Sequence, residues 1–160
     1  MADNARDAYV AGLTLLARRE LSEAQVRQRL VRKGHSVEAV DSAIERLTGE
    51  RALDDARTAE AIARTEVTVR GRGRLRVSQR IQSAGIASAT AKRAVEQVYA
   101  DLDPDALLAG ALDKRLRGRS TIADERERNR LYRYLIGQGF ESDRVIAVLR
   151  KRSGGRGTEG

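Results

Sequence analysis

A short helical unit that ends in glycine recurs three times along this chain, and no other feature limits the possible fold as strongly. The glycines are Gly34, Gly85 and Gly139, spaced 51 and then 54 residues apart. Apolar residues stand eight and four positions before each glycine and six and ten positions after it. Both flanks therefore have the pattern of one apolar helix face, and glycine supplies the left-handed turn that ends a helix. Three matches in register predict a tandem helical array.

Each repeat is typical of three helices joined by tight turns, as in a helix-turn-helix unit. We predict units at 5–50, 53–100 and 104–152, followed by a disordered glycine-rich tail at 153–160. Polar residues at the expected helix starts indicate N-caps. The predicted caps are Ser22 with Gln25, Ser36, Asp54–Asp55, Ser88, Asp103 before Pro104, Thr121 with Asp124, and Ser142.

The composition favours an all-α fold, because the chain has a single proline and few strand-like runs. Hydrophobic residues make up 41% of the chain, which is enough for globular folding. A unit of about 50 residues is nevertheless small for an independent core. We therefore expect neighbouring units to pack on each other.

The chain is strongly basic, with a net charge of +8 and a pI near 10.5, and five of the eight net charges fall in residues 104–160. Such a balance favours a nucleic acid or an acidic protein surface as the partner. The competing interpretation is that these arginines only solvate helix faces. The few aromatic residues, one Phe and four Tyr, make stacked bases less expected than phosphate contacts of weak sequence selectivity.

Basic residues gather in three stretches, which we predict to be the binding sites. Guanidinium groups match phosphate or carboxylate oxygens in bidentate geometry. The first stretch begins in a loop at 70–74, which we expect to be mobile because it holds two glycines and no apolar anchor. In the third stretch, Glu125 and Glu127 are expected to pair with some of the arginines. The predicted site residues are Arg70, Arg72, Arg74, Arg76 and Arg80, then Lys114, Arg115, Arg117 and Arg119, and finally Arg126 and Arg130.

The sequence offers no catalytic constellation. His35 is the only histidine and there is no cysteine, so a triad or a zinc site has no ligands. His35 is expected to pack or to lie at the surface, and Asp54–Asp55 to cap a helix rather than to bind metal. Residues 70–74 lack the strand and the Lys-Ser/Thr ending of a nucleotide loop. We expect no enzyme activity, no metal and no cofactor.

The lack of cysteine suits the cytoplasm. The apolar run at 10–17 is not a signal peptide, because acidic residues precede it and Arg18–Arg19 end it without a small-residue cleavage site. No stretch approaches the ~20 apolar residues of a membrane span. We therefore expect a cytoplasmic protein without membrane contact.

Three motifs in this order resemble the RecX family of bacterial recombinase regulators, over about residues 8–150. They are the stretch at 15–20 leading to 30–34, Leu53-Asp54-Asp55-Ala56-Arg57, and the stretch at 70–73 leading to Ile81 and Gly85-Ile86. The chain differs from the family pattern at Thr58, where an aromatic residue is usual, and at His35, where a hydrophobic one is common.

The resemblance implies three tandem three-helix repeats in an elongated, curved array. It also implies binding to RecA filaments, in their groove or at their growing ends, which restrains strand exchange, ATPase and coprotease activity. We expect the protein itself to be a monomer. Contact with single-stranded DNA is implied too, with double-stranded DNA as a further option.

The main alternative is an autonomous helix-turn-helix DNA-binding protein, since three-helix units can present a recognition helix. The expected third helices, at 37–48, 88–100 and 142–151, are not uniformly basic. The first of them carries Glu38, Asp41 and Glu45. A small enzyme is a third possibility, which the missing catalytic groups argue against.

Overall fold

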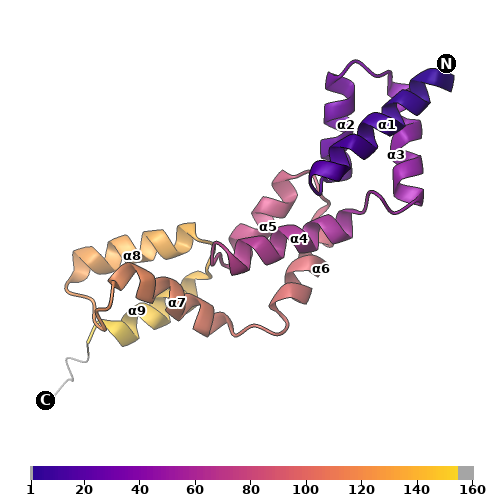
Figure 1. Ribbon diagram of the computed structural model, residues 1–160. Coiled ribbons are helices and arrows are strands. Elements are labelled where there is room, and N and C mark those ends of the chain that lie inside the picture. The colour runs from indigo at the N-terminus through magenta and orange to yellow at the C-terminus, as the bar shows by residue number, and fades with distance from the viewer. Residues whose placement is uncertain (1, 155–160) are drawn as a thin grey trace, which may run out of the picture.

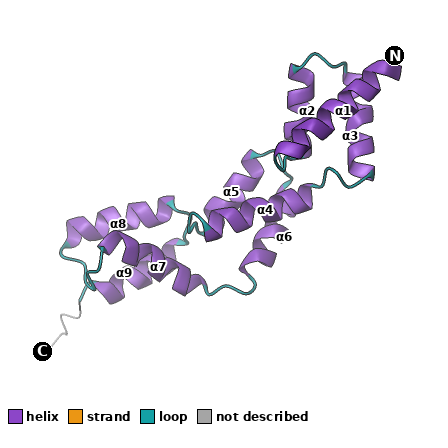
Figure 2. Ribbon diagram, in the orientation of Figure 1, coloured by secondary structure: helices purple, strands orange, loops and turns teal. Residues whose placement is uncertain are grey.

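The computed structural model describes residues 2–154, and within this range the chain forms helices and no strand (Figure 2). The predicted tail at 153–160 therefore falls almost entirely outside the described residues. The described helices are α1 (Ala2–Arg18), α2 (Glu23–Arg32), α3 (Val37–Gly49), α4 (Asp55–Thr68), α5 (Arg74–Ser83), α6 (Ser88–Tyr99), α7 (Pro104–Leu116), α8 (Glu125–Gly137) and α9 (Ser142–Arg152).

The helices form three units of three, set one after another in an elongated, curved array (Figure 1). The predicted fold class is confirmed. Unit 1 is α1–α3, unit 2 is α4–α6 and unit 3 is α7–α9. Each unit has its own apolar cluster, centred on residues such as Leu30, Ile81 and Leu135. Leu107 packs against the clusters of both unit 2 and unit 3.

Local sequence signals explain most helix starts. Ser22 and Gln25 form the predicted capping box, and Ser36 accepts a hydrogen bond from the Ala39 amide at 3.2 Å. Asp103 caps α7 ahead of Pro104, also as predicted. These caps satisfy amides that would otherwise lack a partner in the first helical turn.

Three predicted caps are wrong. Ser88 and Ser142 are the first residues of α6 and α9, and the N-cap positions belong to Ala87 and Glu141, whose side chains make no capping hydrogen bond. At α8 the cap is Asp124 alone, which accepts from the Glu127 amide at 2.8 Å. The helices thus start one or more residues away from where local preference placed them, and a single cap, worth about 1 kcal/mol, does not fix the first helical residue.

Every helix pair that packs extensively belongs to a single unit, so the units meet mainly through their turns. At the first junction the turn between α1 and α2 contacts unit 2. The Asp55 carboxylate accepts from the Glu23 amide at 2.8 Å. The buried Thr58 hydroxyl lies 3.3 Å from the Leu21 carbonyl oxygen and 3.1 Å from the Asp54 carbonyl oxygen of its own unit, so these two acceptors share its hydrogen. The hydroxyl of Ser22 donates to the carbonyl of Ala84, in the turn between α5 and α6.

The second junction repeats this arrangement one unit further along. The start of α5 contacts the turn between α8 and α9: the Gly73 amide donates to the Gln138 carbonyl at 2.9 Å, and the Leu75 amide donates to the Gly139 carbonyl at 3.1 Å. Carbonyls from the end of α8 thus cap the start of α5, where the chain provides no side-chain cap.

This junction corrects the expectation of a mobile loop at 70–74. The loop is short, and its amides at Gly71 and Arg72 donate back to the end of α4. The Tyr99 hydroxyl donates to the Arg72 carbonyl at 2.6 Å. The two glycines are visible in the sequence, but the remote groups that hold the loop, at Gln138 and Tyr99, are not.

Across the described residues, no helix combines the length and the apolar character needed to cross a membrane.

Candidate functional site

The first basic stretch converges on one shielded carboxylate. Guanidinium nitrogens of Arg70, Arg72 and Arg80 lie 3.6, 3.9 and 3.9 Å from the carboxylate oxygens of Glu66. The side chain of Glu66 is only 6% exposed, whereas those of Arg70 and Arg80 are 54% and 59% exposed. Three positive charges around one negative charge leave a net charge of +2 at this surface, which we call the Glu66 cluster.

The other two residues of that stretch form no ion pair with Glu66 among the described residues. The guanidinium of Arg74 lies over the Tyr99 ring, 5.6 Å from its centroid. Burial raises the pKa of Tyr99 to about 12, although the charge of Arg74 opposes this shift. The backbone of Arg76 is in close contact with Gly139 at the second junction.

A second cluster forms in unit 3 around Glu127. Arg119 binds this carboxylate in bidentate fashion, at 2.5 and 3.2 Å. The hydrogen bond from Arg119 lowers the pKa of Glu127, with smaller effects from the charges of Arg119 and Arg130. Arg115, Arg119, Arg130 and Glu127 line a cavity of about 210 Å³. Arg115 also lies over the Tyr134 ring, 4.0 Å from its centroid.

The structure brings one residue from each of the first two predicted stretches into a shared groove. Arg70 and Lys114 line a cavity of about 230 Å³ between units 2 and 3. Tyr134 and Gln138 also line it, together with small residues of α7 such as Gly110. We call this cavity the interunit groove. A chain of phosphates or carboxylates could contact both cations there while small side chains allow close approach.

Two predicted residues remain exposed outside these arrangements. Arg117 ends α7 in a left-handed conformation, with a φ angle of 50°. Arg126 lies exposed on α8. Neither has a geometry that links it to the groove, so the predicted set divides into a central group and peripheral charges.

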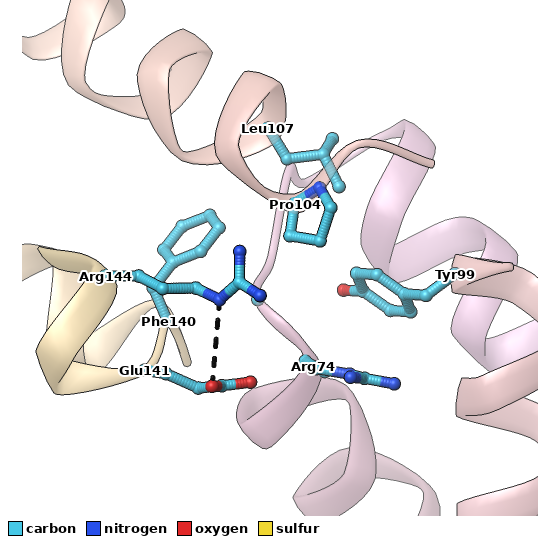
Figure 3. Close-up of a pocket in the computed structure, with 8 residues that line it drawn as sticks. Arg74, Tyr99, Pro104, Leu107, Phe140, Glu141 and Arg144 are labelled. Carbon is cyan, nitrogen blue, oxygen red and sulfur yellow. Dashed lines mark ion pairs between the residues drawn. The ribbon is translucent and has the colours of Figure 1, made fainter. Parts of the chain in front are cut away.

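A smaller pocket at the second junction has a packing role (Figure 3). Its volume is about 20 Å³, which excludes a ligand larger than water. Tyr99, Pro104 and Leu107 line it from units 2 and 3, and Arg144 and Glu141 form an ion pair of 3.8 Å beside it.

The histidine and the two aspartates considered for catalysis or metal binding lie in turns and at a helix start. His35 is half-buried in the turn between α2 and α3. Asp54 caps α4 by accepting from the Ala56 and Arg57 amides, which confirms the capping interpretation. Asp55 joins units 1 and 2 through the Glu23 amide.

Sequence reasoning missed two important residues. Glu66 had a usable signal, since it precedes Arg70 by four positions, the spacing of neighbouring side chains in a helix. Tyr99 had none, because its partner carbonyl at Arg72 is 27 residues away. Glu127 does pair with an arginine, but its partner is Arg119 of the second stretch and not an arginine of its own stretch.

Comparisons with known proteins agree with the fold. Residues 8–47 match the family described as RecX, first three-helix domain. The regulatory protein RecX of Halorhodospira halophila is 36% identical over 139 residues, which cover 86% of this chain and 83% of that protein. The protein of the same name from Acidithiobacillus ferrooxidans is 35% identical over 144 residues, 89% of each chain.

Solved structures are similar over nearly the whole chain. The crystal structure of RecX from Lactobacillus salivarius superposes with a TM-score of 0.76, covering 94% of this chain and 97% of that one, at 20% identity. A second crystal structure, of a regulatory protein RecX, also has a TM-score of 0.76, with 23% identity and coverages of 94% and 73%. At these identities the similarity establishes the fold alone.

Proposed function

The chain belongs to the RecX family of regulatory proteins, and we propose that it is a non-enzymatic negative regulator of the RecA recombinase. In this proposal the protein binds RecA filaments formed on single-stranded DNA and restrains strand exchange, ATPase and coprotease activity. It acts in the cytoplasm as a monomer, without a cofactor.

The observation that carries the proposal is the meeting of Arg70 and Lys114 in the interunit groove. An elongated array that joins basic residues of successive units suits a long, negatively charged partner better than a compact one. The predicted contacts are those of the three stretches, with the Glu66 cluster and the groove at their centre. They would touch DNA phosphates, acidic RecA surface, or both.

The charge on α3 argues against an autonomous helix-turn-helix regulator. Glu38, Asp41 and Glu45 are all exposed on this helix. Asp41 pairs with Arg27 of α2 at 2.5 Å, which also withdraws a cation from any DNA contact there. A recognition helix lying in the major groove needs a base-reading face close to phosphates, where three carboxylates would repel the duplex.

A matched pair of charge reversals tests the proposal. The double variant Arg70→Glu/Lys114→Glu changes the groove, and Arg18→Glu/Arg19→Glu makes the same change in net charge on exposed residues of unit 1. We expect the groove variant to need roughly tenfold more protein, or more, for half-inhibition of RecA-driven strand exchange and ATPase, because it removes two anion contacts and adds repulsion.

The control variant is expected to inhibit within about twofold of the wild type, because peripheral charges contribute little. Wild-type protein that leaves RecA strand exchange and ATPase unchanged would refute the proposed function. Inhibition that survives in the groove variant, or is lost equally in the control, would place the contact elsewhere.

A further inference from the structure

The shielded carboxylate of Glu66 stands where an external anion would be expected to bind. Its three arginine partners lie at 3.6–3.9 Å, which is beyond the distance of a normal hydrogen bond. These are loose ion pairs, in contrast to the 2.5 Å pair between Arg119 and Glu127. Guanidinium groups held this loosely retain N–H donors for another acceptor.

The three arginines differ in freedom. Arg72 is held in place: its amide donates to the Glu66 carbonyl at 3.0 Å, its carbonyl accepts from Tyr99, and its side chain is 20% exposed. Its Nε is buried and has no hydrogen-bond partner among the described residues, so the carboxylate of Glu66 is its compensating charge. Arg70 and Arg80 have long side chains that are more than half exposed. They can turn outward while Arg72 stays with the carboxylate.

We propose that Glu66 is an internal competitor for the anion that Arg70 and Arg80 bind, and that this anion is the phosphate backbone of single-stranded DNA. In the free protein the carboxylate holds both guanidinium groups. When DNA binds, phosphates take over Arg70 and Arg80, and Arg72 remains as the partner of Glu66. The inference rests on the proposed function, because it assumes that this surface contacts DNA.

The arrangement makes binding at this surface weak and reversible. Each arginine must leave the carboxylate of Glu66 to contact an incoming anion, so the exchange contributes little to the binding free energy of a single small anion. A strand with successive phosphates gains more, because it also releases its own counterions. A carboxylate that only organised the cluster would have the opposite effect, since its removal would let three like charges spread apart and would weaken binding.

The variant Glu66→Gln, which removes the negative charge, separates the role of competitor from the role of organising the cluster. Binding of a fluorescent 30-nucleotide oligothymidylate is followed by anisotropy over a series of NaCl concentrations. We expect Glu66→Gln to bind roughly three- to tenfold more tightly than the wild type at low salt, from the loss of one nearby negative charge. The slope of log K against log salt should steepen by up to about 0.7 for each additional phosphate contacted.

The control is Glu60→Gln, which removes the same charge from the same helix. Glu60 pairs with Arg64 at 3.1 Å and lies outside the cluster. It should change the affinity less than about twofold, because its charge is paired with Arg64 and does not face Arg70 or Arg80 as an ion-pair partner. In a double-mutant cycle, the gain from Glu66→Gln should disappear in an Arg70→Gln/Arg80→Gln background, which a general effect on folding would not produce.

Circular dichroism and a urea midpoint establish that each variant is folded. If Glu66→Gln unfolds, Glu66→Asp takes its place: it withdraws the carboxylate from Arg70 and Arg80 by one methylene and should also tighten binding. The inference is overturned if the folded variant binds DNA as well as or worse than the wild type. It is equally overturned if Glu60→Gln gains as much, or if the gain persists without Arg70 and Arg80.

Failure of the inference can be told from failure of the proposed function. If no form of the protein binds the oligonucleotide, the DNA contact and the inference both fall, while the RecA inhibition assay still decides whether the protein is a regulator. If the wild type binds and Glu66→Gln does not differ from it, only the role of Glu66 is refuted.

Discussion

Replacing Gly139 with alanine would test whether the glycine turns hold the units together. Two effects are expected at this position. The φ angle of Gly139 is +97°, a left-handed conformation in which a Cβ atom costs about 1–2 kcal/mol. In addition, a methyl group at Gly139 would collide with the backbone nitrogen and Cβ of Arg76 in the neighbouring unit.

Gly34 provides a matched control for the first effect. It occupies the equivalent turn of unit 1 with a φ angle of +94°, and no atom lies within 4 Å of where its Cβ would be. Gly34→Ala should therefore lower the free energy of unfolding by about 1–2 kcal/mol. Relief of the collision at Gly139 requires breaking the hydrogen bonds from the Gly73 and Leu75 amides, worth about 1 kcal/mol each. Gly139→Ala should therefore cost about 3–4 kcal/mol.

Urea unfolding followed by circular dichroism measures the two losses, and hydrogen exchange locates them. The amides of Gly73 and Leu75 should exchange faster in Gly139→Ala and at the wild-type rate in Gly34→Ala. Equal losses of stability in the two variants, with unchanged protection of these two amides, would refute the idea that the turn joins the units.

Two further predictions concern buried polar groups. Burial raises the pKa of Tyr99 to about 12, whereas an unfolded tyrosine titrates near 10, so the free energy of unfolding should fall as pH rises from about 10 to 12. This part of the decline should be absent in Tyr99→Phe. Urea unfolding at several pH values tests this, and the same slope of unfolding free energy against pH in both proteins would contradict it. Thr58→Val keeps the side-chain volume but removes the hydroxyl that lies 3.3 Å from the Leu21 carbonyl oxygen and 3.1 Å from the Asp54 carbonyl oxygen. It should lose about 1–2 kcal/mol in the same assay, whereas unchanged stability would contradict a role of this hydroxyl at the first junction.

The helices could be predicted from the sequence because their signals are local. The capping box at Ser22 and the Asp103–Pro104 start each depend on residues within one helical turn. The junctions could not be predicted in this way. The Gly73 amide donates to the carbonyl of Gln138, 65 residues away, and no local pattern in either stretch indicates this contact. Gly85 and Gly139 hold equivalent places in the repeat, and each lies against the preceding unit, at Ala24 and Arg76 respectively.

The candidate site was only partly predictable for a related reason. Sequence positions show that Arg70 and Arg80 are basic and that no acidic residue lies between them. They do not show that the end of α4 brings the carboxylate of Glu66 beneath both. Nor do they show that Lys114, from another unit, shares a groove with Arg70. Net charge therefore indicates the class of partner, while the available charge at each surface depends on tertiary contacts.

The groove and the second junction are physically linked. Arg70 belongs to unit 2 and Lys114 to unit 3, and these units meet mainly through the hydrogen bonds at residues 73–75 and 138–139 and through the packing of Leu107. The distance between the two cations thus depends on how this junction is set. A polyanion that contacts both cations favours the junction geometry in which they share a groove, and the same free energy must appear as stabilisation of the junction. Binding of such a polyanion would therefore be coupled to the geometry of this junction.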